Sequence, residues 1–116
     1  MIPSGVEIYV ALEPVDMRLS FDRLAGLAHE QTGYDARSGA LFIFFGRRRD
    51  SLKILFFDGS GMAIFYKRLD RHTFKIPEPP SAGVRYVEID DAALEALLDG
   101  IDIDSADDAR SRPKTH

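Results

Sequence analysis

Residues 52–69 read LKILFFDGSGMAIFYKRL, two apolar stretches of strand length joined by a turn with two glycines in four residues. Glycine and aspartate at such a junction are typical of a β-hairpin, because glycine readily adopts the backbone conformations of a tight turn. If this turn places Phe57 opposite Met62, strand alternation divides the side chains between two faces of the hairpin. The pattern therefore predicts strands at 52–57 and 62–69.

The two faces of this hairpin differ in polarity. One face is apolar along its length, with Lys67 as the polar exception, and carries Leu52, Ile54, Phe56, Ala63, Phe65 and Leu69. The other face is apolar only near the turn, at Leu55, Phe57, Met62 and Ile64, and carries Lys53, Tyr66 and Arg68 toward its open end. The first face is the expected core face. The apolar part of the second face also needs cover, because large apolar patches are rare on monomers. We expect the C-terminal helix to cover it through Leu94, Leu97 and Leu98, with a homodimer as the alternative.

The rest of the chain predicts an α+β fold. The expected elements are strands at 6–12, 41–45, 73–76 and 84–89, a helix from Phe21 to about Gly33, and a helix from about 91 to Gly100. Together with the hairpin they suggest an antiparallel meander of about five or six strands with two helices. We expect residues 1–103 to form this single domain and residues 104–116 to be a disordered polar tail.

Composition and charge narrow the class of protein. A length of 116 residues is enough for one domain, and the absence of cysteine excludes disulfides, thiolate metal sites and cysteine nucleophiles. The sequence contains neither a signal peptide nor an apolar run of membrane-spanning length, so we expect a cytoplasmic protein with no membrane partner. The net charge of −4 is unevenly distributed: residues 37–75 hold nine basic and three acidic side chains, between acidic flanks.

Most of these basic residues are expected to gather at the open end of the hairpin. Arg47, Arg48 and Arg49 lie in the connection that enters the hairpin there, and Lys53, Tyr66, Lys67, Arg68 and Arg71 are expected near the same end. Guanidinium groups beside an exposed ring suit phosphate contact and base stacking, which makes these eight residues candidates for nucleic-acid binding. Three adjacent arginines are also typical of a solvated loop, and this alternative stays open.

No catalytic or cofactor-binding pattern is present in the sequence. It has no phosphate-binding loop and no Gly-x-Ser-x-Gly motif, and its three histidines lack metal-ligand spacing. Four aspartates could in principle converge on magnesium, namely Asp16, Asp22, Asp50 and Asp58. Turn, helix-terminal and ion-pair functions explain them better. We therefore expect a non-enzymatic protein with no catalytic residue, metal or cofactor.

Short motifs in a distinctive order run through almost the whole chain. They are Asp16-Met17-Arg18, Phe21-Asp22-x-Leu24, Gly39-x-Leu41-Phe42-Ile43-Phe44, Arg47-Arg48-Arg49-Asp50, Lys53-Ile54-Leu55, Asp58-Gly59-x-Gly61, Lys67-Arg68-Leu69 and Leu97-Leu98-x-Gly100-Ile101-Asp102. In order and spacing they resemble the TnpB-type second open-reading-frame protein of the insertion-sequence-66 (IS66) family of bacterial mobile elements. The chain departs from this family where tryptophan is usual, at Phe57 and Ile76, and where a basic residue and glycine follow Asp-Met-Arg, at Leu19 and Ser20.

The resemblance implies an accessory protein of transposition, encoded beside a separate transposase that carries the acidic active site. It assigns no role to the motif residues Asp16, Met17, Arg18, Asp58, Gly59 and Gly61. Two molecular functions stay open. The basic hairpin end would contact DNA in the first. In the second, the protein would be an adaptor that docks on the transposase through its second sheet face or its acidic C-terminal helix.

Overall fold

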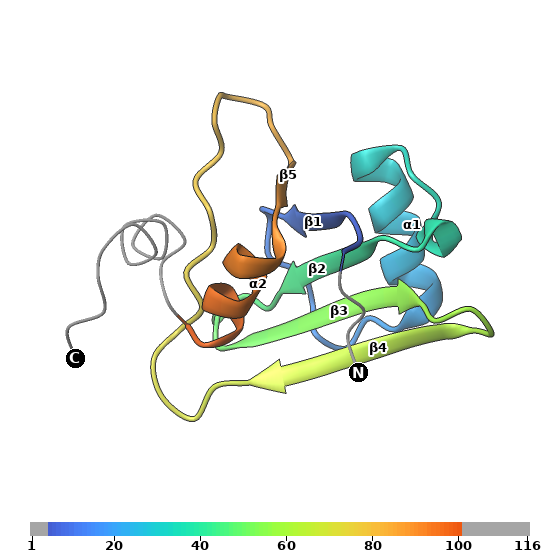
Figure 1. Cartoon of the computed structure of the whole chain (residues 1–116). Coiled ribbons are helices and arrows are strands. Elements are labelled where there is room, and N and C mark those ends of the chain that lie inside the picture. The colour runs from blue at the N-terminus through green and yellow to red at the C-terminus, as the bar shows by residue number, and fades with distance from the viewer. Residues whose placement is uncertain (1–4, 101–116) are drawn as a thin grey trace.

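The computed structural model describes residues 5–100, which form a five-stranded sheet with an α-helix on each face (Figure 1). In chain order the elements are β1 Ile8–Ala11, α1 Phe21–Thr32, a 3-10 turn Ala36–Ser38, β2 Leu41–Phe45, β3 Ser51–Phe57, β4 Met62–Arg68, β5 Tyr86–Ile89 and α2 Asp91–Leu98. The strands lie in the order β4-β3-β2-β1-β5. The α+β class and the strand count expected from the sequence are confirmed. The tail expected to be disordered, residues 104–116, lies outside the described residues.

The sheet is mixed. Strands β1 and β2 pair in parallel, with Ile8 opposite Leu41, whereas the other three strand pairs are antiparallel. Helix α1 connects β1 to β2 as a crossover that returns the chain to the same end of the sheet, so the expected meander does not extend to this pair. Residues 73–76, expected to add a short strand, join no strand of the described sheet. Because of this topology, the C-terminal ends of β1, β2 and β4 all lie at the same end of the sheet.

The β3–β4 hairpin has the register expected from its turn. Phe57 pairs with Met62, and the ladder continues to the pair of Ser51 and Arg68. The Asp58 carboxylate accepts hydrogen bonds of 2.9 Å from the backbone N–H groups of Ser60 and Gly61, and Gly59 has a φ of 102°. These N–H groups also hold the pKa of Asp58 below its ordinary value, because they stabilise the carboxylate. The motif residues Asp58, Gly59 and Gly61 therefore build the turn.

Alternation along the strands gives the sheet two apolar faces. Leu52, Ile54 and Phe56 lie on the face covered by α2, in one cluster with its Leu94 and Leu97. Leu55, Met62 and Ile64 lie on the opposite face, in one cluster with Leu24 and Ala28 of α1. The expectation that the C-terminal helix covers the second face is therefore wrong. Helix α1 already shields that face, so its apolar side chains give no reason to infer a homodimer.

Candidate nucleic-acid interface

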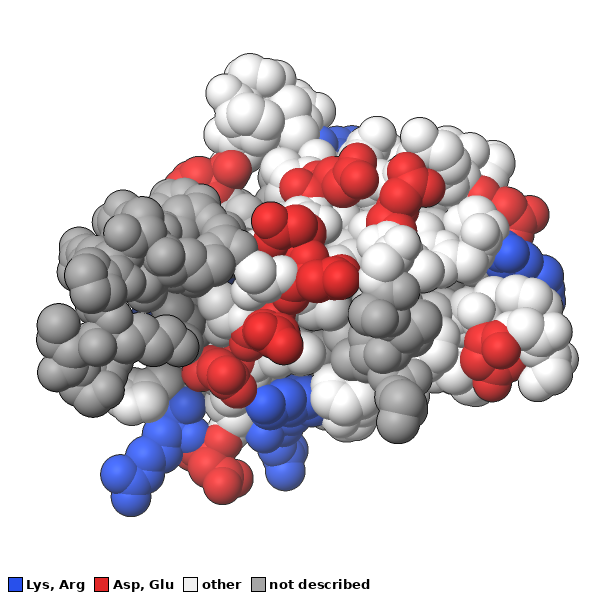
Figure 2. Space-filling model, in the orientation of Figure 1, with Lys and Arg blue, Asp and Glu red and all other residues white. Residues whose placement is uncertain are grey.

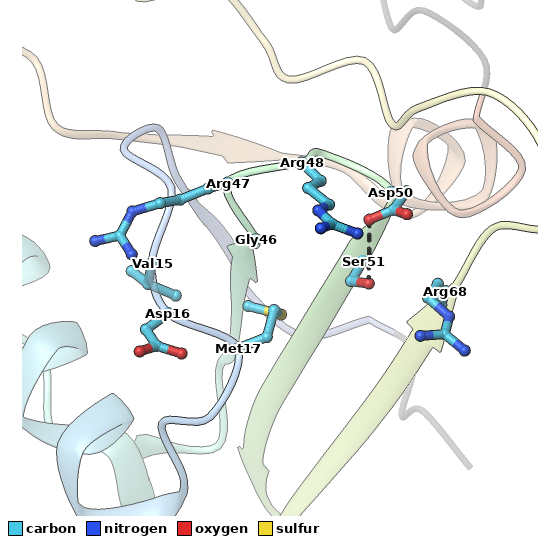
Figure 3. A pocket seen from close by; sticks show the side chains of 9 residues that line it. All are labelled: Val15, Asp16, Met17, Gly46, Arg47, Arg48, Asp50, Ser51 and Arg68. Atoms are coloured by element: carbon cyan, nitrogen blue, oxygen red, sulfur yellow. Dashed lines mark hydrogen bonds between the residues drawn. The ribbon is translucent and has the colours of Figure 1, made fainter.

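An arginine-lined hollow of about 250 Å³ lies at the end of the sheet where β1, β2 and β4 have their C-terminal ends (Figure 3). Three segments that are distant in sequence form it: the β1–α1 connection, the β2–β3 turn and the end of β4. Its lining consists of Val15, Asp16, Met17, Gly46, Arg47, Arg48, Asp50, Ser51 and Arg68. The hollow thus brings the Asp16-Met17-Arg18 segment and the arginine run together, a contact that the sequence did not predict.

The backbone of the β2–β3 turn is held from both sides, while its arginine side chains are exposed. Gly46 forms a parallel bridge with Val15, and its N–H donates to the Ser51 carbonyl at 3.0 Å. The Arg49 N–H donates to the Gly46 carbonyl at 2.9 Å, and Arg49 has a φ of 64°, in the left-handed region. Its own carbonyl accepts a 2.6 Å hydrogen bond from the Phe74 N–H. The turn therefore has a fixed shape, and its arginine side chains contribute little to the core.

Glycine at position 46 permits the close approach of Met17. A Cβ atom on Gly46 would lie 2.7 Å from Met17 Cγ, well inside van der Waals contact. Met17 also packs against the α1-side cluster. Met17 is thus the anchor through which the β1–α1 segment meets the β2–β3 turn.

Asp16 and Arg18 form an ion pair with an N–O distance of 2.7 Å beside the hollow. The Arg18 guanidinium and its backbone N–H both donate to the Asp16 carboxylate. These hydrogen bonds lower the pKa of Asp16 to about 2, with a smaller effect from the nearby charge of Arg47. Two carboxylates therefore line the hollow beside its arginines: Asp16, whose charge Arg18 largely compensates, and Asp50, which accepts a 3.4 Å hydrogen bond from the Ser51 hydroxyl.

Lys53 and Tyr66 continue the candidate surface along the α1 side of the sheet. They pair across β3 and β4, two residues from the pair of Ser51 and Arg68, so all four side chains share that face. Lys53 Nζ donates to the Leu19 carbonyl at 2.8 Å and lies 5.3 Å from the centroid of the Tyr66 ring. The side chain of Tyr66 is exposed.

Lys67 does not join this surface. Alternation turns it to the α2 side of the sheet, where its Nζ donates to the Leu98 carbonyl at the end of that helix at 2.8 Å. Arg49 and Arg71 are exposed but do not line the hollow. The eight candidates are thus distributed over more than one surface. Arg47, Arg48 and Arg68 line the hollow, with Lys53 and Tyr66 beside it.

The four aspartates that could have formed a magnesium site do not gather at one place: Asp16 and Asp50 line the hollow, and the other two lie elsewhere. Asp22 lies in the first turn of α1. Asp58 lies in the β3–β4 hairpin turn, at the opposite end of the sheet from Asp16 and Asp50. Within residues 5–100, no group of three or more His, Cys, Asp or Glu side chains is arranged to hold a metal ion.

Fold and site together define a small α+β protein with an arginine-lined hollow at one end of a mixed sheet. Residues 6–108 match the sequence model of the family described as IS66 Orf2 like protein, so the chain belongs to the IS66 Orf2-like family. Membership implies an accessory role in transposition.

Two relatives come from Sinorhizobium fredii (strain NBRC 101917 / NGR234), and both are described as uncharacterised. Protein y4hO is 40% identical over 104 residues, which are 88% of each chain. Protein y4jC is 33% identical over 98 residues, or 84% of this chain and 81% of the relative. No solved structure matches the chain. Among residues 5–100, no helix combines the length and the apolar character needed to cross a membrane.

Proposed function

We propose that this protein is a non-catalytic accessory protein of insertion-sequence transposition that contacts DNA through the arginine-lined hollow. The observation that carries the proposal is that Arg47, Arg48 and Arg68, which come from two separate segments, line one concave surface. The family's association with transposition makes DNA the polyanion that such a surface would meet.

Phosphate recognition suits the chemistry of this hollow. Each guanidinium presents planar, permanently charged donors that match phosphate oxygens. The β2–β3 turn and the β4 ladder hold the three backbones, so the arginines lose little backbone freedom on binding. Contacts of this kind release counterions, so binding should weaken steeply with salt despite the net charge of −4.

Fluorescence anisotropy of labelled DNA tests this proposal with the full chain. The variant Arg47→Gln/Arg48→Gln should bind more weakly, and the slope of log affinity against log salt should fall by up to about two units. A matched control is Arg23→Gln/Arg37→Gln, because both of these arginines are exposed and neither lines the hollow. Equal loss in the two variants would show that only overall charge matters. No DNA binding by the unaltered chain would overturn the proposal.

A second candidate function is an adaptor that docks on the transposase without binding DNA. Figure 2 shows acidic side chains gathered over the face that carries α2 and β5. Exposed carboxylates recur at Asp91 and Glu95 of α2 and at Asp99, the residue that caps its C-terminus. Such a surface suits a basic segment of a partner. Capture of the element's purified transposase in the absence of DNA, lost in Glu95→Gln/Asp99→Asn, would favour this candidate.

A further inference from the structure

Tyr66 is a large ring left in solvent beside the hollow. Its exposed fraction is 53%, the highest among the large hydrophobic side chains of residues 5–100. Strand β4 is an edge of the sheet, so no described strand covers its outer side. The ring makes a cation–π contact with Lys53, whose Nζ is held by the Leu19 carbonyl. The contact places a fixed positive charge over one face of the ring, and the exposed part of the ring is available for stacking.

Tyr66 and the hollow lie on one continuous face. Tyr66 and Arg68 are two residues apart on β4, so their side chains leave the sheet on the same side, about 7 Å apart along the strand. Arg68 lines the hollow together with Arg47 and Arg48. A group held in the hollow would therefore have the ring as its neighbour along the sheet edge.

The size of the hollow limits what it can hold. Its volume of about 250 Å³ is below the roughly 300–1,000 Å³ of pockets that enclose small organic ligands. Its charged lining suits a phosphate group rather than a base. The base belonging to that phosphate would lie outside the hollow, where the exposed ring of Tyr66 offers a stacking surface.

Duplex and single-stranded DNA use these two features differently. A duplex presents its phosphates but keeps the faces of its bases stacked inside the helix, so it can engage the arginines and not the ring. An unpaired strand offers phosphates and open base faces together, the combination of groups that sequence-tolerant single-strand sites bind. We propose that this protein prefers unpaired nucleotides, with one phosphate in the hollow and a neighbouring base stacked on Tyr66. The inference rests on the proposed function and specifies the form of DNA.

Anisotropy with two probes, an oligodeoxythymidine and a mixed-sequence duplex of the same length at the same salt concentration, tests the inference. The full chain should bind the single strand about tenfold more tightly than the duplex. Tyr66→Thr, which removes the ring but keeps a residue that suits a strand, should abolish this preference by weakening single-strand binding about tenfold. Tyr66→Phe should retain it. Tyr34→Thr is the matched control, because Tyr34 is also exposed, at 45%, and does not line the hollow.

The outcomes separate this inference from the function on which it rests. Equal affinity for the two probes, or a preference that survives in Tyr66→Thr, would overturn the single-strand inference and leave DNA binding in place. Binding to neither probe would overturn the proposed function itself. Circular dichroism of each variant verifies that the fold is intact.

Discussion

Gly46→Ala tests how the β1–α1 segment is fastened to the β2–β3 turn. The added Cβ atom would lie 2.7 Å from Met17 Cγ and 3.8 Å from Ser51 Cβ, so the clash is with Met17 alone. Met17 packs against the α1-side cluster, and moving it disturbs that packing. Forcing one extra carbon into such a contact destabilises a fold by about 1–3 kcal/mol. We expect Gly46→Ala to lower the free energy of unfolding by about 2 kcal/mol.

A double-mutant cycle isolates the contact. Met17→Ala removes the Cγ atom that the new Cβ would meet, so Gly46→Ala should cost less than about 1 kcal/mol in that background, which implies a coupling of about 1 kcal/mol or more. Urea unfolding followed by far-UV circular dichroism measures the unaltered chain and the three variants, since the chain has no tryptophan to serve as a fluorescent probe. Equal costs in both backgrounds, or no cost in either, would refute this account of the contact.

Three further substitutions test other parts of the account. Leu24→Ala should lower the free energy of unfolding by about 2–5 kcal/mol in urea unfolding, because Leu24 is fully buried between α1 and the sheet, and a loss below about 1 kcal/mol would contradict that packing. Asp16→Asn should flatten the loss of stability on acidification between pH 3.8 and about 2; the pKa of Asp16 is lowered in the fold, so its pairing stabilises the protein above this window and is lost within it. If the free energy of unfolding falls between these pH values as steeply in Asp16→Asn as in the unaltered chain, this explanation is refuted. Lys67→Met should cost about 1 kcal/mol through the lost bond to the Leu98 carbonyl, yet weaken DNA binding less than Arg68→Gln does in anisotropy titrations. Equal losses of affinity would place Lys67 in the interface.

Local chemistry was sufficient to predict the hairpin. The residues of the turn supply the hydrogen bonds that shape it, because the Asp58 carboxylate accepts from the N–H of Gly61. One correct pairing, Phe57 with Met62, then determines the face of every other residue in both strands. The placement of α2 could not be predicted in this way. The spacing of Leu94 and Leu97 shows that the helix has a buried stripe, but both faces of the sheet are apolar near their centre, so the stripe itself does not specify which face it meets.

The candidate site was predictable in part. Alternation within β4 places Tyr66 and Arg68 on one face and Lys67 on the other, as the sequence predicts, so nearness to the open end of the hairpin is not enough to put Lys67 in one surface with them. The contact between Met17 and Gly46 depends on the parallel pairing of β1 with β2, which is set by tertiary structure. The one available signal was the order strand, helix, strand, which is typical of a parallel crossover.

The most direct test of the central claim is a titration of isotopically labelled protein with short DNA, followed through backbone amide shifts in NMR spectra. The account predicts that the largest shifts fall on residues 46–49 and 66–68 and on Met17, the segments that surround the hollow. Residues of α2 should shift little, because that helix lies on the other face and carries exposed carboxylates. Shifts centred on α2, or none at saturating DNA, would contradict the claim that the arginine-lined hollow contacts DNA.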